Sequence, residues 1–223
     1  MLLQPTLPTV RQLRIETAFD CNGVFYHIAT AGSQRAYENP HTTCQVHAAM
    51  SSVCSLFHLP CQPVQSIMLQ GVPEAECAGS AHRVVQWHHP NDQPSCNITE
   101  DIPGSWCSVD LGERRSLVVT DYCLRADHGT STHESAHEGS VKFSPRNWCL
   151  QGSLDGAQWV TLRRHDNDSS LTMYSIAAWP VADSTSSWRH FRIYQHGPNS
   201  HNTHHLCLTG FEMYGYLTDL FFY

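Results

Sequence analysis

One stretch of this 223-residue chain is most informative about its structure: Arg146-Asn147-Trp148-Cys149-Leu150-Gln151-Gly152-Ser153-Leu154-Asp155-Gly156, followed closely by Trp159-Val160-Thr161-Leu162. Asp155-Gly156 is a tight-turn signal, because an Asp-Gly pair accepts the positive φ angles that a short hairpin loop demands. The runs on either side, 148–152 and 158–163, have the length and composition of short strands. The stretch therefore predicts a β-hairpin.

Similar short runs occur on both sides of this hairpin and are separated by turn residues such as His196-Gly197-Pro198. We find no internal repeat and no sign of a helix longer than about three turns. Many short β-type runs predict an all-β sandwich or barrel. The expected strands are residues 24–29, 44–50, 65–69, 83–87, 106–111, 117–125, 148–152, 158–163, 174–179, 190–195 and 206–214.

Three further patterns predict how the sandwich is packed. Cys107, Val109 and Leu111 alternate with polar residues and so share one face of a strand. The run 211–215 also alternates, with Glu212 and Tyr214 opposite the apolar positions, which predicts a strand covered on one face only. Large aromatic side chains usually bury, so the core between the sheets is expected to hold three tryptophans: Trp148, Trp159 and Trp188.

The composition of the chain argues against several classes of protein. The chain has 13 Lys and Arg against 20 Asp and Glu, a formal net charge of −7, which disfavours binding to nucleic acid through a basic face. Hydrophobic residues make up 41% and charged residues 15%, so the chain folds, and its length predicts one domain. No stretch approaches the roughly 18 apolar residues of a membrane helix, so no membrane span is expected.

The N-terminal residues 1–10 have no basic segment followed by an apolar one, so we expect no secretory signal and a cytoplasmic or nuclear protein. In such a reducing compartment the ten cysteines are expected to be thiols, and the two sequons, at Asn97 and Asn167, to carry no glycan. The four cysteines expected within strands as small buried thiols are Cys107, Cys123, Cys149 and Cys207.

Several blocks, in this order and spacing, resemble the discoidin-like domain, also called coagulation factor type C. The blocks are residues 105–112, 122–125, 146–156, 159–162, 188–193 and 208–215. Residues 19–26 and 37–40 resemble the first strands of the variant found in large HECT-type ubiquitin ligases and BTB-domain adaptors. The resemblance implies a galactose-binding-like jelly-roll β-sandwich over residues 19–216. It leaves an N-terminal extension, 1–18, a poorly matched insert rich in Pro, Cys and His, 53–104, and a C-terminal tail, 217–223.

The resemblance also implies a function: a non-catalytic recognition module that binds a protein segment through loops at one end of the sandwich, without a cofactor. Such a module would be an adaptor or targeting part of a ubiquitin-ligase system. Candidate loops are 31–40, 126–144 and 164–170, since loops vary freely on a strand scaffold. The candidate ligand-binding residues are Tyr37, His128, Arg146 and His165. A lectin-like module that binds carbohydrate through the same loops is the alternative, as an exposed Trp or Tyr beside Asp, Asn or Arg would indicate.

A third hypothesis is a zinc-dependent hydrolase, because His133-Glu134-Ser135-Ala136-His137 is a literal H-E-x-x-H motif. Its neighbours are loop residues and no third ligand follows at the usual spacing, so a polar loop is favoured and no metal is expected. A site assembled from Cys54, Cys61, Cys77 and His82 is the other metal option that the spacing leaves open. Residues 165–170 have the residue types of an acid–base site but the composition of a turn, which we favour.

Overall fold

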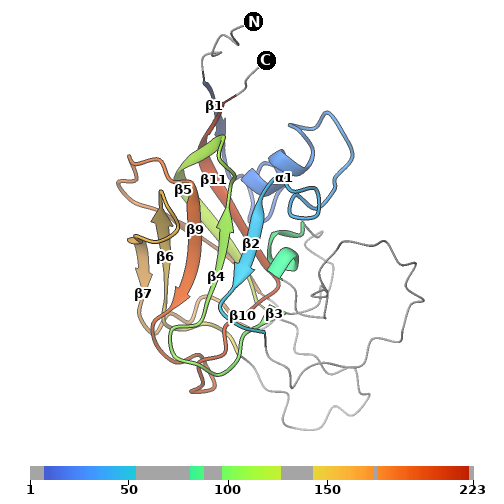
Figure 1. The fold of residues 1–223 in the computed structure, drawn as a ribbon. Coiled ribbons are helices and arrows are strands. Elements are labelled where there is room, and N and C mark those ends of the chain that lie inside the picture. The colour runs from blue at the N-terminus through green and yellow to red at the C-terminus, as the bar shows by residue number, and fades with distance from the viewer. Residues whose placement is uncertain (1–7, 54–80, 88–96, 127–142, 173–174, 221–223) are drawn as a thin grey trace, which may run out of the picture.

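The computed structural model describes residues 8–53, 81–87, 97–126, 143–172 and 175–220. Two antiparallel sheets form the molecule: one of four strands in the order β1-β11-β5-β8, and one of five in the order β2-β4-β9-β6-β7, with β10 and β3 as a small separate pair (Figure 1). The predicted all-β sandwich is confirmed. The strands are β1 (Thr9–Leu13), β2 (His47–Met50), β3 (Asn97–Ile98), β4 (Trp106–Asp110), β5 (Arg115–Arg125), β6 (Trp148–Ser153), β7 (Val160–His165), β8 (Ile176–Pro180), β9 (His190–Gln195), β10 (Cys207–Leu208) and β11 (Gly210–Asp219).

The predicted hairpin is present as β6 and β7. Asp155 holds its turn, because its carboxylate accepts hydrogen bonds from the backbone N–H groups of Ala157 and Gln158, both at 2.8 Å. Gly156 adopts a φ of 73°, a left-handed conformation that glycine reaches at no steric cost. The expected strands from residue 106 onward are likewise present, although 206–214 divides into β10 and β11.

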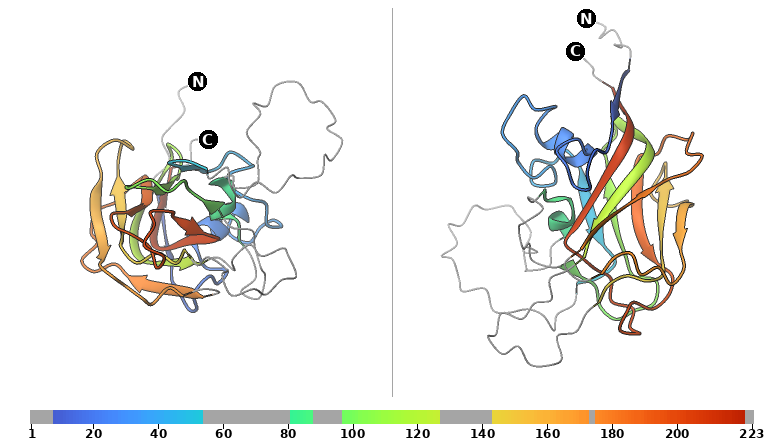
Figure 2. Two further views of the ribbon diagram at one scale, coloured as in Figure 1. Left: turned by 90° about the horizontal axis from the view of Figure 1, so that it is seen from below. Right: turned by 180° about the vertical axis from the view of Figure 1, so that it is seen from behind.

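Two expected strands are helical instead. Residues 24–29 form the α-helix α1 (Val24–Ala29), and 83–87 overlap the 3₁₀ helix η2 (Ala81–Val85). Both contact β11, and η2 also contacts β2, so they fill the side of the sandwich between these strands (Figure 2). A continuous apolar run fits a buried strand and a buried helix equally well, which is why the pattern misled. The expected strand 65–69 lies outside the described residues.

The core lies between the two sheets and is built mostly from aromatic and branched side chains. Trp148, Tyr122 and Phe191 are fully buried there, and Phe25 of α1 packs edge-on against Phe211 of β11 at 5.8 Å between ring centroids. The expected burial of Trp148 is therefore confirmed, and Trp188 packs half-buried against the core. The expectation for Trp159 is wrong: it lies half-buried beneath the side chain of Arg192, on the outer face of the five-stranded sheet.

Strand β11 is covered on both faces, contrary to the one-sided strand that its alternation predicted. Phe211 and Met213 face the core, while Glu212 and Tyr214 are also buried. Tyr214 packs against Cys123 and Phe19, which belongs to the segment that leads into α1. The residues that alternate with the core-facing ones, Glu212 and Tyr214, thus lie on a second buried face of the strand and not on a solvent-exposed one.

The two ends of the described chain meet in the four-stranded sheet. Strand β1 lies in the stretch expected as an extension, and it pairs with β11 from Thr9 opposite Asp219 to Leu13 opposite Gly215. Gly215 forms a bulge in β11, where a Cβ atom would come within 2.1 Å of the carbonyl oxygen of Val118. Both strands therefore belong to the sandwich.

The cysteines follow the expected chemistry with one correction. Cys107, Cys123 and Cys149 are buried thiols, whereas Cys21 and Cys44 are free and exposed. Cys207, expected as a thiol, is disulfide-bonded. The compartment argument from residues 1–10 could not have found this bond, because a disulfide depends on two Cβ atoms meeting in the fold.

Candidate functional site

The strand directions bring several loops together at the end of the sandwich remote from β1 and the last residues of β11 (Figure 1). Strand β6 begins at this end, and its antiparallel neighbours β7 and β9 finish there. The loops that precede β6 and follow β7 and β9 are therefore neighbours. We call this surface the loop end and define it by six residues: Arg146, Asn147, Arg164, Asp166, Asn167 and His196.

The side chain of Asn147 connects these loops through hydrogen bonds. Its side-chain oxygen accepts a hydrogen bond from the backbone N–H of Asn167 at 2.8 Å, and its amide nitrogen donates to the carbonyl of Pro198 at 2.7 Å. The carbonyl of Arg146 accepts from the N–H of Asp168 at 2.8 Å. The side chain of Asn147 and the backbone carbonyl of Arg146 thus hold the turn 166–170 against the loops before β6 and after β9.

Two charged groups of the loop end, Arg164 and Asp166, are exposed. Arg164 and Asp166 form an ion pair at 2.8 Å, with side chains 55% and 63% exposed, and hydrogen bonding to Arg164 lowers the pKa of Asp166. Arg164 Nη2 also lies 3.2 Å from Nδ1 of His196, whose Nε2 contacts the carbonyl oxygen of His165 at 3.0 Å. Arg146 is half-exposed, and its guanidinium has no hydrogen-bond or ion-pair partner within the described part of the chain.

The structure places His165 beneath this surface rather than on it. Only 4% of the residue is exposed, and its ring stacks on Trp148 with 4.1 Å between centroids and 7° between planes. Its Nε2 lies 2.7 Å from the hydroxyl of Tyr122, which already accepts a hydrogen bond from the indole N–H of Trp148 at 3.1 Å. Its Nδ1 lies 2.6 Å from Asp168 Oδ2.

These contacts determine which ring nitrogen of His165 carries the hydrogen. Tyr122 has accepted the indole hydrogen, so its own hydroxyl donates to Nε2, to which Arg163 Nε also donates at 3.2 Å. Nδ1 therefore carries the hydrogen and donates it to Asp168. Burial lowers the pKa of His165, although Asp168 opposes this, and the neutral ring is the stable form. For Asp168, burial raises the pKa, but hydrogen bonds from Ser170 and His165 outweigh it and hold the value low.

Asp168, His165 and Tyr122 thus have the order of a carboxylate–imidazole–hydroxyl relay. Burial raises the pKa of Tyr122 well above its usual range, and its hydroxyl faces the core between Trp148 and His165. The hydroxyl is a poor nucleophile there, because its ionised form is strongly disfavoured. The arrangement orients and supports residues 166–170. These residues belong to the segment whose composition predicted a turn.

Tyr37 lies at a different place from the loop end. It stacks on Tyr26 of α1 at 5.7 Å, and its hydroxyl accepts a hydrogen bond from the N–H of Trp87 at 2.7 Å and donates to the carbonyl of Val85 at 3.3 Å. Burial raises its pKa to about 12. It fastens η2 beside β2, whereas β7, which carries His165, is at the opposite edge of the same sheet.

The remaining candidates fall partly or wholly outside the described residues. These are His128, the motif His133, Glu134 and His137, and the cysteines Cys54, Cys61 and Cys77. Among the residues that the structure does describe, no three His, Cys, Asp or Glu side chains gather in a way that could hold a metal ion. No described helix is long and apolar enough to cross a membrane.

A cavity of about 320 Å³ lies at the other end of the sandwich, where β4 finishes and β2 and β9 begin, and is lined by His41, Asp110 and Arg189 among others. Arg189 donates to both carboxylate oxygens of Asp110, at 2.7 and 2.6 Å. Burial raises the pKa of Asp110, but these bonds and one from the N–H of Gly112 outweigh it and keep the value low. The charges of Asp110 and Arg189 are thus already paired with each other within the cavity wall. The sequence gives no sign of this pair, whose members are 79 positions apart.

Comparison with known proteins supports the resemblance read from the sequence. The chain is 42% identical over 122 residues, 52% of its length, to the E3 ubiquitin-protein ligase Ufd4 of Drosophila melanogaster. It is 30% identical over 213 residues, 94% of its length, to the E3 ubiquitin-protein ligase hecd-1 of Caenorhabditis elegans. It is 27% identical over 202 residues, 88% of its length, to a BTB/POZ domain-containing protein of Arabidopsis thaliana.

The chain spans only 4%, 7% and 21% of the lengths of these three relatives. No protein-family model matches it. Among solved structures, the carbohydrate-binding module CBM32-3 from a family 31 glycoside hydrolase of Clostridium perfringens is similar, with a TM-score of 0.50 and 11% identity, over 83% of this chain and 97% of that one. The β-sandwich fold and the similarity to ubiquitin ligases and a BTB/POZ protein, both predicted from sequence, are confirmed.

Proposed function

We propose that this chain is a non-catalytic recognition module that binds a segment of another protein through the loop end, as the targeting or adaptor part of a ubiquitin-ligase system. The observation that carries the proposal is the similarity of nearly the whole chain to a small part of a ubiquitin ligase. The proposal assigns ubiquitin transfer to other parts of a longer chain or to a partner, acting in the cytoplasm or nucleus, and requires no cofactor.

The geometry of the loop end supports this proposal. Binding residues are usually carried on loops that a rigid scaffold positions, and here Asn147 and His165 hold the loops from below. Arg146, Arg164 and Asp166 present charges of both signs at the surface. Of the four candidates from the sequence, Arg146 retains a direct contact role in the proposal. His165 becomes a positioning residue, Tyr37 fastens η2 away from this surface, and His128 remains a candidate.

Affinity capture with quantitative mass spectrometry tests the proposal. The intact chain is compared with the double variant Arg146→Ala/Arg164→Ala and with Arg11→Ala/Arg14→Ala, which removes the same charge from the exposed strand β1 and its end. We expect a set of proteins, including ubiquitin-ligase components or their substrates, that the first variant loses at least tenfold and the second retains. Identical protein lists for all three would overturn the loop end as the binding surface.

The lectin-like alternative predicts a different outcome. Carbohydrate modules stack sugar rings on exposed aromatic side chains, whereas the described loop-end residues are Arg, Asn, Asp and His, and Trp148 and Trp179 are buried beneath them. A glycan array probed with the same three proteins separates the alternatives. Binding to defined glycans that Arg146→Ala/Arg164→Ala abolishes would replace the protein segment by a sugar as the ligand.

A further inference from the structure

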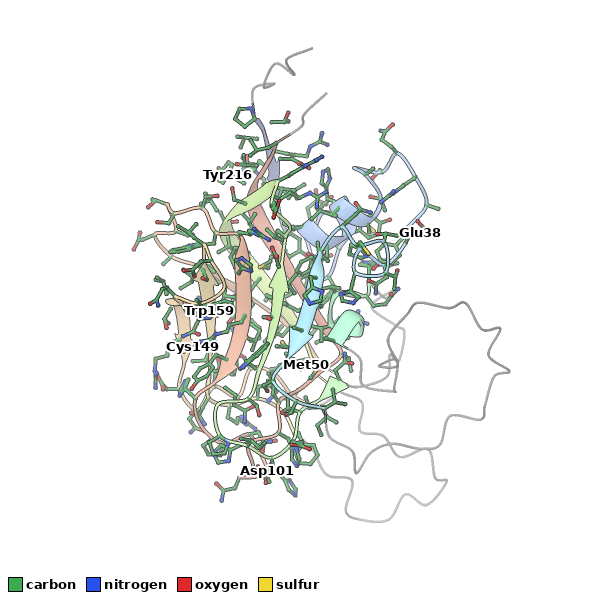
Figure 3. The ribbon with its side chains drawn as sticks, viewed as in Figure 1. Glu38, Met50, Asp101, Cys149, Trp159 and Tyr216 are labelled. Carbon is green, nitrogen blue, oxygen red and sulfur yellow. The ribbon has the colours of Figure 1, made fainter. Side chains whose placement is uncertain are left out.

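The outer face of the five-stranded sheet carries a row of large polar and aromatic side chains. On this face Trp106 of β4 lies opposite Tyr194 of β9, and Arg192 lies opposite Gln151 of β6. Trp159, labelled in Figure 3 and directly before β7, adds a second indole, which contacts Arg192. All five side chains are partly exposed. We call this surface the Arg192 face and define it by Trp106, Gln151, Trp159, Arg192 and Tyr194.

Arg192 is held in place from three sides. Its guanidinium carbon lies 4.2 Å from the ring centroid of Trp159 and 4.9 Å from that of Tyr194. Its Nε donates to Gln151 Oε1 at 2.7 Å. Guanidinium groups stack favourably on aromatic faces, and the hydrogen bond at Nε fixes the rotation of the plane. The two terminal nitrogens are therefore the groups left to contact another molecule.

The charge of Arg192 is not balanced by a carboxylate. Arg115, Arg164 and Arg189 each pair with an aspartate, but Arg192 has no ion-pair partner among the residues that the structure describes. Burial against the two rings lowers its pKa, which reports partial desolvation of the cation. A partly desolvated charge without a counter-charge is unfavourable in the free protein, and a carboxylate supplied from outside would relieve it.

We propose that the Arg192 face docks an extended segment of a partner protein that places an Asp or Glu carboxylate on the terminal nitrogens of Arg192. Apolar residues on either side of that carboxylate pack against Trp106 and Trp159. Trp, Tyr and Arg are the residue types that most often dominate binding energy at interfaces, and here one cluster contains all three, already oriented. The surface is separate from the loop end and goes beyond the function proposed above.

Two other ligand classes fit this geometry less well. Phosphate groups in peptides are usually bound by clusters of arginines, whereas Arg192 is the single cation within this cluster of five residues. A sugar ring needs a free aromatic face, and the faces of Trp159 and Tyr194 nearest each other are covered by the guanidinium. A carboxylate needs only the two terminal nitrogens, whose N–H groups donate to its two oxygens in a two-point geometry.

A random 12-residue peptide library displayed on phage, selected on the intact chain, tests the proposal. We expect selected peptides to share one Asp or Glu between apolar positions. A synthetic peptide from that set should lose at least tenfold in affinity when its Asp is replaced by Asn, and also when the chain carries Arg192→Gln. The matched control is Arg11→Gln, which removes a cation from the exposed strand β1 of the other sheet, and it should change the affinity less than twofold.

The remaining outcomes are decisive. Failure to select peptides, or peptides that bind equally well with Asn or to Arg192→Gln, would overturn the proposal. If Arg192→Gln fails to fold, Arg192→Lys and the Asp→Asn peptide still decide it, since Lys keeps the charge but lacks the planar fork and should weaken binding by several fold. Loss of binding with Arg164→Gln but not Arg192→Gln would assign the peptide to the loop end and contradict the Arg192 face.

Discussion

The carboxyl group of Glu212 accepts a hydrogen bond from the backbone N–H of Phe25 at 2.9 Å, and so a side chain of the last long strand caps a helix that begins almost 190 positions earlier. The same carboxyl group accepts from the N–H groups of Tyr26 and Met213, at 3.2 and 2.8 Å. Gly23 makes this approach achievable, because a Cβ atom there would lie 2.1 Å from the carboxyl carbon. Glu212 thus replaces the usual Ser, Thr or Asp cap of α1.

This cap predicts a specific pH dependence. Burial raises the pKa of Glu212 to about 8, against the three N–H donors that lower it. A folded pKa above the ordinary value of 4.5 means that the neutral acid is favoured in the folded state. The contribution of the group to stability is therefore complete below pH 4.5 and lost as the pH rises through 8.

We expect the wild type to lose stability relative to Glu212→Gln between pH 4.5 and 8, measured by urea denaturation at several pH values. Glu212→Ala should cost about 3 kcal/mol or more at every pH, because it leaves three N–H groups without a partner. A stability difference between wild type and Glu212→Gln that does not change with pH would contradict the assignment.

The hydroxyl of Tyr122 is expected to stabilise the core. Tyr122→Phe removes the acceptor of the Trp148 indole N–H and a donor to His165, and should lower the free energy of unfolding by about 1–3 kcal/mol. Tyr216→Phe is the matched control, since it removes a hydroxyl that bonds the side chain of Gln12 at an exposed position. Equal denaturation midpoints for the two variants would show that the buried network adds no stability.

Two tryptophan substitutions should differ sharply. Trp148→Ala opens a cavity in the core and is expected to cost about 3–5 kcal/mol or to unfold the chain. Trp159→Ala removes a half-exposed ring from the outer sheet face and should cost about 1 kcal/mol. Thermal denaturation followed by circular dichroism measures both, and similar melting temperatures would place Trp159 in the core after all.

Thiol labelling of the native chain is expected to separate the free cysteines into two classes. Cys21 and Cys44 are exposed and should react readily with iodoacetamide near neutral pH. Burial raises the pKa of Cys107 and Cys123 to about 12 and also raises that of Cys149, so these three should react only after unfolding. Peptide mapping by mass spectrometry gives the reactivity of each, and rapid labelling of Cys107 in the native state would contradict the packing of β4.

The sequence of a segment predicted its structure where that structure depends only on residues close to it along the chain. The β6–β7 hairpin follows from Asp155-Gly156, and the inward face of β4 follows from the alternation at Cys107 and Val109. Helix α1 could not be predicted in this way, because its cap, Glu212, comes from a strand far along the chain. The same limit applies to the disulfide at Cys207 and to the pairing of Asp110 with Arg189.

In the candidate site, too, features set by sequence neighbours were predicted and features set by distant residues were not. Turn composition correctly assigned residues 166–170 to a loop, but His165 ends the preceding strand with its ring turned inward, so it positions that loop from beneath. Aromatic character alone could not separate Trp148 from Trp159, since the register of β6, β7 and β9 decides which indole meets the core and which meets Arg192. Burial of Trp148 and exposure of Trp159 are thus set by contacts between segments distant in the sequence.

The pairing of β1 with β11 has a consequence for how such a unit is carried within a larger polypeptide. Thr9 and Asp219 are direct partners, so the backbone enters and leaves the sandwich about 5 Å apart. A host chain could accommodate the whole sandwich as an insertion in one of its surface turns, with almost no displacement of the residues on either side. Adjacent entry and exit points of this kind fit a unit that makes up only 4% or 7% of a relative's polypeptide.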